Sequence, residues 1–133
     1  MYGSLDISTS GMIAQRTRMA VIANNIANVN TIENSKGEYE PYLRRAAILS
    51  AAGSNGQVKG VQISDIEIQQ GALKPAWRPG HPNADADGNI MVPDIDTTSE
   101  WVNGLEASRA YEANVVAAEA TKSMMAQALR LLA

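Results

Sequence analysis

Four asparagines crowd seven consecutive positions near the start of the chain, and they constrain the fold more than any other feature: Asn24, Asn25, Asn28 and Asn30. The segment is otherwise helical in pattern, because apolar residues recur every seven positions at Leu5, Met12, Met19 and Ile26. Asparagine weakens an isolated helix, since its amide competes for backbone hydrogen bonds. A helix with an apolar seam and a separate amide-rich face is typical of a helix with two partners. The pattern predicts a subunit of an assembly.

The composition predicts a thin hydrophobic core. Of the 133 residues 45% are hydrophobic, but Phe is absent and aromatic residues are only 5%. Large apolar side chains supply most of the free energy gained by burial. The helices are therefore expected to gain stability from neighbouring molecules. A net charge of −3 gives no electrostatic basis for binding nucleic acid.

Cysteine is absent, which excludes disulfides and thiolate metal sites. No segment reaches the roughly 18 apolar residues of a membrane-spanning helix. The first residues lack the basic and apolar regions of a cleaved signal peptide. If the chain leaves the cytoplasm, it is expected to do so by another route.

The predicted fold is mainly α with a small β-rich insert. One helix is expected from about Leu5 to Asn30, and a second from Thr97 or Thr98, with Thr98 as a candidate N-cap, to the end of the chain. Residues 1–31 and 97–133 are predicted to pair as a coiled-coil-like axial core domain. Residues 32–96 are predicted to form a β-hairpin and irregular insert.

Within the insert, Asn55-Gly56 predicts a hairpin turn between strands in Tyr42–Ser50 and Gln57–Gln69. The apolar residues of the second strand change parity, and a bulge near Ser64-Asp65 would reconcile them. Four prolines predict that Lys74 to Asp94 is extended and irregular, with a tight turn at Asp87-Gly88.

The helical faces divide the candidate residues into two groups. At about 100° per residue the apolar face of the first helix points away from its amides. The apolar face is predicted to pair with a stripe on the C-terminal helix, within the chain, through Met19, Ile22, Ile26, Val29, Ala118, Met125 and Leu129. The predicted assembly interface consists of Asn24, Asn25, Asn28, Asn30, Arg109, Tyr111 and Asn114.

The stretch from Asn83 to Asp94 raises an alternative, a calcium-binding module. It has oxygen-bearing side chains at positions 1, 3 and 5, glycine at 6 and an acid at 12. However, the first position is an amide, and nearby prolines oppose the flanking helices of such a loop. A loop with Asp87-Gly88 at its tip is favoured, and no metal site is assigned.

No group of residues predicts catalysis. His81 is the only histidine, the serines near the N-terminus have no paired base, and there is no Gly-rich phosphate loop. The chain is predicted not to be an enzyme and to need no cofactor.

Motifs at both ends resemble a known family. The N-terminal motifs are Asp6–Met12 and Asn24–Thr31, and the C-terminal motif is Ser108–Tyr111 with Asn114. They resemble the axial proteins of the bacterial flagellum, which are the rod, hook and hook-junction subunits. Four further segments are similar to the proximal rod subunits of that family: Pro41–Arg45, His81–Gly88, Met91–Pro93 and Lys122–Met125.

The resemblance implies a structural subunit that assembles helically with itself, with other rod subunits and with components of the rod base. It implies a place in the periplasm-crossing rod, with the terminal helices lining the inner tube. It also implies export by the flagellar type III apparatus without a cleaved signal. From the charge and the lack of a long apolar segment, neither binding to nucleic acid nor direct insertion into a membrane is expected. A helical adaptor unrelated to flagella is the remaining alternative.

Overall fold

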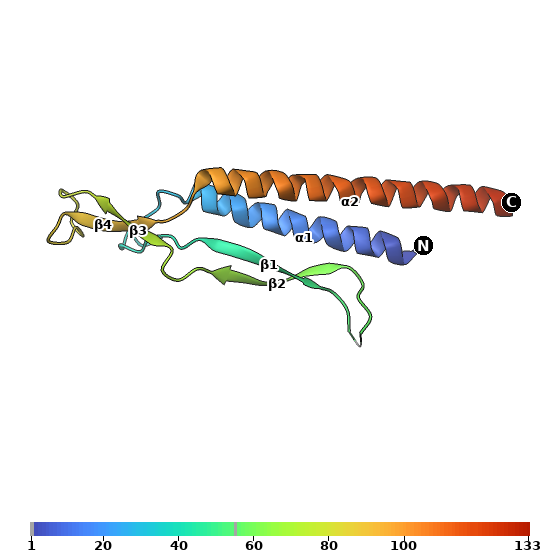
Figure 1. Ribbon diagram of the computed structural model, residues 1–133, viewed down its shortest axis with the longest axis horizontal. Coiled ribbons are helices and arrows are strands. Elements are labelled where there is room, and N and C mark those ends of the chain that lie inside the picture. The colour runs from blue at the N-terminus through green and yellow to red at the C-terminus, as the bar shows by residue number, and fades with distance from the viewer. Residues whose placement is uncertain (1, 55) are drawn as a thin grey trace.

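The computed structural model describes residues 2–54 and 56–133. Two helices, α1 (Tyr2–Ala27) and α2 (Thr97–Leu132), enclose four strands in sequence: β1 (Arg45–Ala51), β2 (Val61–Ile68), β3 (Leu73–Trp77) and β4 (Asn89–Pro93). The molecule is elongated, with α1 and α2 side by side and the β1–β2 hairpin along α1 (Figure 1). The β3–β4 hairpin extends from the end opposite the two termini. The predicted mixture of terminal helices and a β-rich middle is confirmed, whereas the coiled-coil-like supercoil stays a prediction.

Helix α1 has other bounds than predicted, whereas α2 begins at Thr97, one of the two predicted starts. Helix α1 ends at Ala27 rather than Asn30, where Asn28 donates its amide to the Asn24 carbonyl and accepts from the Thr31 hydroxyl. Helix α2 is capped by Asp96, so the assignment of Thr98 as N-cap is wrong. Hydrogen bonds from the Ser99 hydroxyl and the Thr98 amide lower the pKa of Asp96.

The β1–β2 pairing confirms the predicted bulge. Ile48 lies opposite Asp65 and Leu49 opposite Ile63, so Ser64 is the extra residue. In the predicted turn, Asn55 lies outside the described residues, and Gly56 has a φ of +77°.

The β3–β4 hairpin replaces the irregular segment that was predicted from its prolines. Pro75 and Pro93 both lie in paired strands, with Pro75 opposite Met91. A two-stranded sheet consists only of edge strands, where a proline lacking an N–H is tolerated. The turn has Gly88 at φ +81°, as Asp87-Gly88 predicted.

The contact between α1 and α2 is made mainly by small and polar residues. The buried residues of α1 are Ser8, Gly11, Ala14, Val21, Ile22 and Asn25, and those of α2 are Glu100, Ala107 and Thr121. A methyl group on Gly11 would lie 2.6–2.8 Å from the side-chain atoms of Asn114, so the helices approach closely there. The predicted apolar seam is displaced toward one side: Ile22 is buried, but Met19, Ile26 and Val29 are only half-buried.

Candidate assembly surfaces

Asn25 lies at the centre of a buried polar cluster where the two helices meet the insert. Its side-chain oxygen accepts from the Arg45 backbone N–H and the Tyr42 hydroxyl, both at 3.0 Å. Its nitrogen donates to the Arg45 carbonyl at 2.7 Å and to Glu100 Oε2 at 3.2 Å. Since an amide has two donors and two acceptor positions, its hydrogen-bonding capacity is fully used. We call Asn25, Tyr42, Arg44, Arg45 and Glu100 the Asn25 node.

Glu100 brings the second helix into this node. Its side chain is 1% exposed, and its Oε1 lies 2.5 Å from Nε of Arg44, which is 23% exposed. A buried carboxylate is costly unless it is both paired and hydrogen-bonded. Arg44 supplies the opposite charge and Asn25 supplies a hydrogen bond, so the carboxylate is satisfied within the chain.

Tyr42 completes the node from the start of the insert. Burial raises the pKa of its hydroxyl, Glu100 raises it further, and Arg45, whose guanidinium lies 5.7 Å from the ring centre, opposes the rise. The hydroxyl therefore stays protonated and continues to donate to Asn25.

The node corrects one predicted interface residue. Asn25 was expected to face a neighbouring subunit, but it is 0% exposed and all its partners belong to its own chain. Tyr42, Arg44 and Glu100 were not predicted as site residues from the sequence. The available signal for Tyr42 and Arg44 was their position beside Arg45 in the segment that follows the asparagines. A single sequence contains no signal that pairs this segment with Glu100.

The other predicted interface residues have different surroundings. Asn24, Asn30 and Arg109 are exposed, whereas Asn28 and Tyr111 are half-buried. Asn114 lies against Gly11 of α1 and donates to the Ala110 carbonyl, so its side chain serves the contact between the helices. Asn114 is half-buried, so its place at a subunit interface stays a prediction, as it does for Asn24, Asn28, Asn30, Arg109 and Tyr111.

An apolar groove runs along one side of the helix pair, near the start of α2. It has a volume of about 510 Å³, and we call it the helix groove. Its residues from α1 include Met19, Ile26 and Ala27; those from α2 include Trp101, Leu105 and Ser108. Trp101 is 67% exposed and Leu105 is 56% exposed. The chain itself therefore leaves both of these large apolar side chains uncovered.

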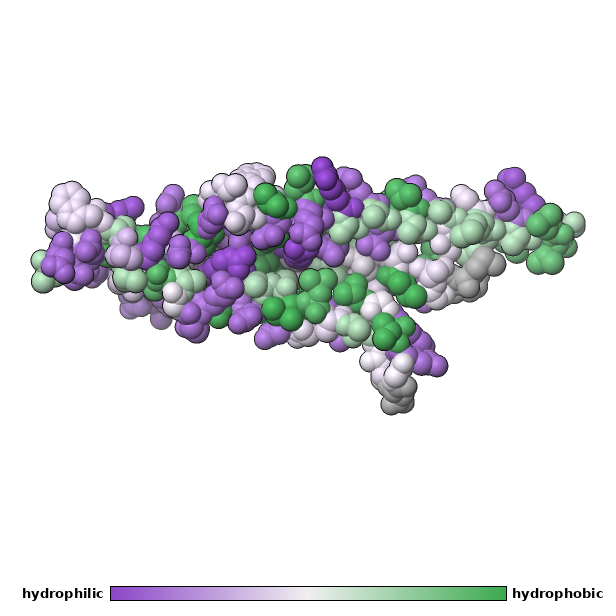
Figure 2. Space-filling model, in the orientation of Figure 1, coloured by the Kyte–Doolittle hydropathy of each residue, from purple (hydrophilic) through white to green (hydrophobic). Residues whose placement is uncertain are grey.

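At the other end of α2, the helix runs past the start of α1 (Figure 1). Leu129, predicted to pair with α1, is 67% exposed, so the chain does not bury it against α1. The two other α2 residues that were predicted to pair with α1, Ala118 and Met125, are half-buried. Figure 2 shows hydrophobic colour at this tip, where Leu131 and Leu132 are exposed.

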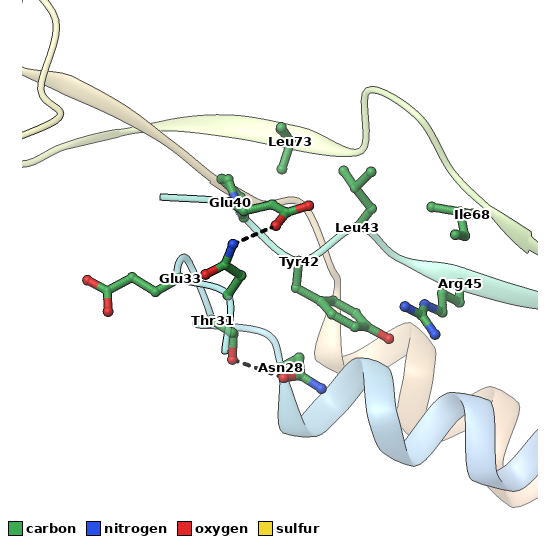
Figure 3. Close-up of a pocket in the computed structure, with 11 residues that line it drawn as sticks. Asn28, Thr31, Glu33, Glu40, Tyr42, Leu43, Arg45, Ile68 and Leu73 are labelled. Carbon is green, nitrogen blue, oxygen red and sulfur yellow. Dashed lines mark hydrogen bonds between the residues drawn. The ribbon is translucent and has the colours of Figure 1, made fainter. Parts of the chain in front are cut away.

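A more polar pocket of about 550 Å³ lies where the loop after α1 meets the insert (Figure 3). Tyr42, Leu43 and Arg45 lie on one side of it, and Glu33 and Glu40 on the other. Asn34 donates to Glu40 at 3.0 Å, which holds the loop. The pocket is formed by mixed charges and aliphatic groups, with no arrangement that indicates one ligand.

The calcium-loop pattern does not form a calcium-binding structure in the chain. The Asp85 carboxylate accepts from the backbone N–H groups of Asp87 and Asn89, and residues 89–93 of the twelve are strand β4. Such a loop needs helices on both sides, and here it joins two strands. Among residues 2–54 and 56–133, no group of three or more His, Asp or Glu side chains is placed to hold a metal ion.

In the described part of the chain, neither helix combines the length and the apolar character that crossing a membrane requires.

Comparison with known proteins gives a consistent result over almost the full length. A family model described as "Flagella basal body rod protein" matches residues 5–32. The chain is 33% identical to the flagellar basal-body rod protein FlgC of Bacillus subtilis, over 98% of this chain and 97% of that protein. It is 35% identical to FlgC of Salmonella typhimurium, over 95% and 93%, and 33% identical to FlgC of Borreliella burgdorferi, over 99% and 97%.

Proposed function

Because this chain belongs to the FlgC family of flagellar basal-body rod proteins, we propose that it is a structural subunit of the bacterial flagellar rod, with no enzymatic activity. The observation that carries the proposal is the similarity to FlgC, which extends through both helices and the insert rather than through one motif. The subunit assembles with other components of the basal-body rod.

The finer proposal is that this is a proximal rod subunit that lies in the periplasm. The helix pair, residues 1–31 and 97–133, forms the axial core around the export channel, and the insert, residues 32–96, lies outside it. The chain reaches the rod through the flagellar type III export apparatus without a cleaved signal. The absence of cysteine suits that route, since an exported, unfolded chain cannot then be trapped by disulfides.

In this proposal the Asn25 node makes the subunit stiff. It joins the end of α1, the start of β1 and the start of α2 through hydrogen bonds that all lie within one chain. A rod that transmits torque needs subunits in which the outer part cannot swing relative to the core. Fully satisfied buried polar networks hold one arrangement of the elements they join.

The exposed residues among those predicted for the interface are proposed to contact neighbouring subunits. Asn24 and Arg109 are exposed on the two helices and Asn30 is exposed in the turn after α1, where their side chains can meet other chains in the assembly. Replacing Asn24 by Ala is expected to leave the stability of the isolated subunit unchanged and to impair rod assembly.

The proposal is tested by deleting the gene in its source organism and supplying it again with a small tag. Loss of swimming on deletion, its recovery with the tagged gene, and the tag located in the rod of purified basal bodies by electron microscopy are expected. Normal swimming after deletion, or purified rods that lack the tag, would reject it.

A further inference from the structure

The stripe of α2 that faces α1 continues beyond the point where α1 begins. Two series with a period of seven carry this stripe: Glu100, Ala107, Asn114, Thr121, and Gly104, Tyr111, Ala118. The first series continues to Ala128, and the second continues to Met125 and Leu132. From the contact between Gly11 and Asn114, α1 extends nine residues to Tyr2, while α2 extends eighteen residues to Leu132. About two and a half turns of α2, roughly 13.5 Å, therefore lie past α1.

The character of the stripe changes where it leaves α1. Against α1 it presents small or polar residues such as Ala107 and Asn114, which suit a close contact between two helices. In the overhang it presents Met125 and Leu132, and Leu132 is 85% exposed. Figure 2 shows this apolar tip at one end of the molecule. A helix stripe that becomes more apolar as it leaves its own partner is suited to a partner in another molecule.

The helix groove is an apolar surface at the other end of α2, and it is suited to contact the apolar tip of another molecule. It is formed by the exposed Trp101 and Leu105 of α2 with Met19 and Ile26 of α1. The two surfaces cannot meet within one chain, because residues 105 and 132 of a straight helix are roughly 40 Å apart.

The charges of the two surfaces are also complementary. The turn before the overhang carries the exposed Lys122 on the flank of the stripe, and no acidic residue follows Glu119. Arg130 lies about 160° around the helix from Leu132, on the side away from the stripe. The side of α2 that continues from the groove carries the exposed carboxylates of Glu112 and Glu119. Opposite charges at the rim of an apolar contact favour one partner and one orientation.

We infer that the C-terminal overhang of α2, residues 124–133, inserts into the helix groove of a second copy of this chain. The inference rests on the proposed role as a rod subunit and names the surfaces by which like subunits meet. Because the two surfaces differ, the contact is head-to-tail and leaves one tip and one groove open at each step. Such a contact forms rings or open helical arrays rather than closed twofold dimers.

The absence of cysteine from the chain allows a direct test by disulfide cross-linking of the full-length protein. Ser108→Cys places a thiol in the groove and Ala128→Cys places one on the overhang, and neither removes an apolar groove residue or a leucine. Within one chain these positions are roughly 30 Å apart along the helix, too far for a disulfide. The double variant, concentrated and oxidised, is expected to give a ladder of dimers, trimers and longer species.

The matched control moves only the groove cysteine. Ala113→Cys with Ala128→Cys keeps two thiols on α2, but Ala113 is exposed and lies about 140° around the helix from Ser108. This pair is expected to give no ladder. A ladder of equal strength from both pairs, dimers only, or no cross-linked species from the Ser108 pair would each overturn the inference.

A second pair of variants tests the overhang itself. Leu132→Glu changes a residue of the stripe, while Leu131→Glu changes its neighbour, which is similarly exposed at 87% but points about 100° away. In the Ser108–Ala128 background, Leu132→Glu should abolish the ladder and Leu131→Glu should retain it. An equal effect of the two would reject the insertion of this face. If these tests fail while the gene still restores swimming, the inference is wrong and the proposed function stands.

Discussion

The two ends of α2 differ in whether their side chains find partners within the chain. At its start, Glu100 is buried and bonded to Asn25 and Arg44 of the same chain. At its end, Leu129, Leu131 and Leu132 are mostly exposed. The first end is completed by the chain itself, and the second offers an apolar surface to other molecules. The polar end fixes α2 against α1 and the insert, whereas the apolar end is the part that we propose contacts another copy of the chain.

The largest effect on stability is expected at the ion pair of the node. Arg44→Ala would leave the buried Glu100 carboxylate without its opposite charge, and should lower the free energy of unfolding by about 3 kcal/mol. The expected loss of unfolding free energy lies at the low end of the range for buried ion pairs because Arg44 is 23% exposed. Urea unfolding measures it, and the double variant Arg44→Ala/Glu100→Gln should recover part of the loss. A change below about 1 kcal/mol, typical of surface pairs, would show that the carboxylate is not truly buried.

A comparison of two neighbouring asparagines gives the next largest difference. Asn25→Ala would remove four hydrogen bonds, and it would leave the part-buried backbone N–H and C=O of Arg45 and the buried Glu100 Oε2 without those partners, costing about 2–3 kcal/mol. Asn24→Ala is the matched control, since Asn24 is exposed and alanine is the better helix former. Its unfolding free energy should stay the same or rise slightly. Equal losses from the two variants would contradict the assignment of Asn25 to the interior.

The close approach of the helices is tested by glycine substitutions in α1. Gly11→Ala would place a methyl group against Asn114 and should destabilise the chain by about 1–2 kcal/mol through overpacking. Gly3→Ala meets nothing within 4 Å, and because Gly3 lies in the first turn of α1 it should stabilise the helix by less than the roughly 0.5–1 kcal/mol expected in a helix interior. Thermal unfolding compares them, and Asn114→Ala should relieve the Gly11→Ala defect. A neutral Gly11→Ala would mean that the helices are farther apart than described.

The smallest expected effect is a dependence on alkaline pH. Burial raises the pKa of Tyr42 in the folded chain above its usual value near 10. The unfolded chain therefore loses this proton first, so the contribution of Tyr42 is complete below pH 10 and is lost as pH rises through the folded pKa. The difference in unfolding free energy between the wild type and Tyr42→Phe should shrink above pH 10. A difference that is independent of pH would place the hydroxyl in solvent.

Much of the architecture could be predicted from the sequence, because local signals determine it. Period-seven apolar residues, the parity change between Ile63 and Ile66, and Asp87-Gly88 predicted the helices, the bulge and a turn. The β3–β4 hairpin was missed because Pro75 and Pro93 weaken a strand prediction, and the pairing that tolerates them is not visible in either segment alone.

The candidate site was harder to predict, since its residues are far apart in the chain. Asn25 and Glu100 are separated by 75 positions, and an acid on a helix normally belongs to a solvated face. The face of α1 that contacts α2 was also predicted too far around the helix. The prediction relied on the large residues Met19 and Ile26, which are only half-buried. Small residues such as Gly11 and Ala14 lie there instead, where they allow the second helix to approach.

Amide hydrogen exchange along α2 tests the contrast between its two ends most directly. In the dilute, isolated subunit, residues 100–107 should exchange slowly, because they pack on α1 and join the node, whereas residues 124–132 should exchange quickly. In assembled rods the second segment should become protected as well. Equal protection of both segments in the isolated subunit, or a last segment that stays unprotected in rods, would contradict the division between a completed end and an end left for assembly.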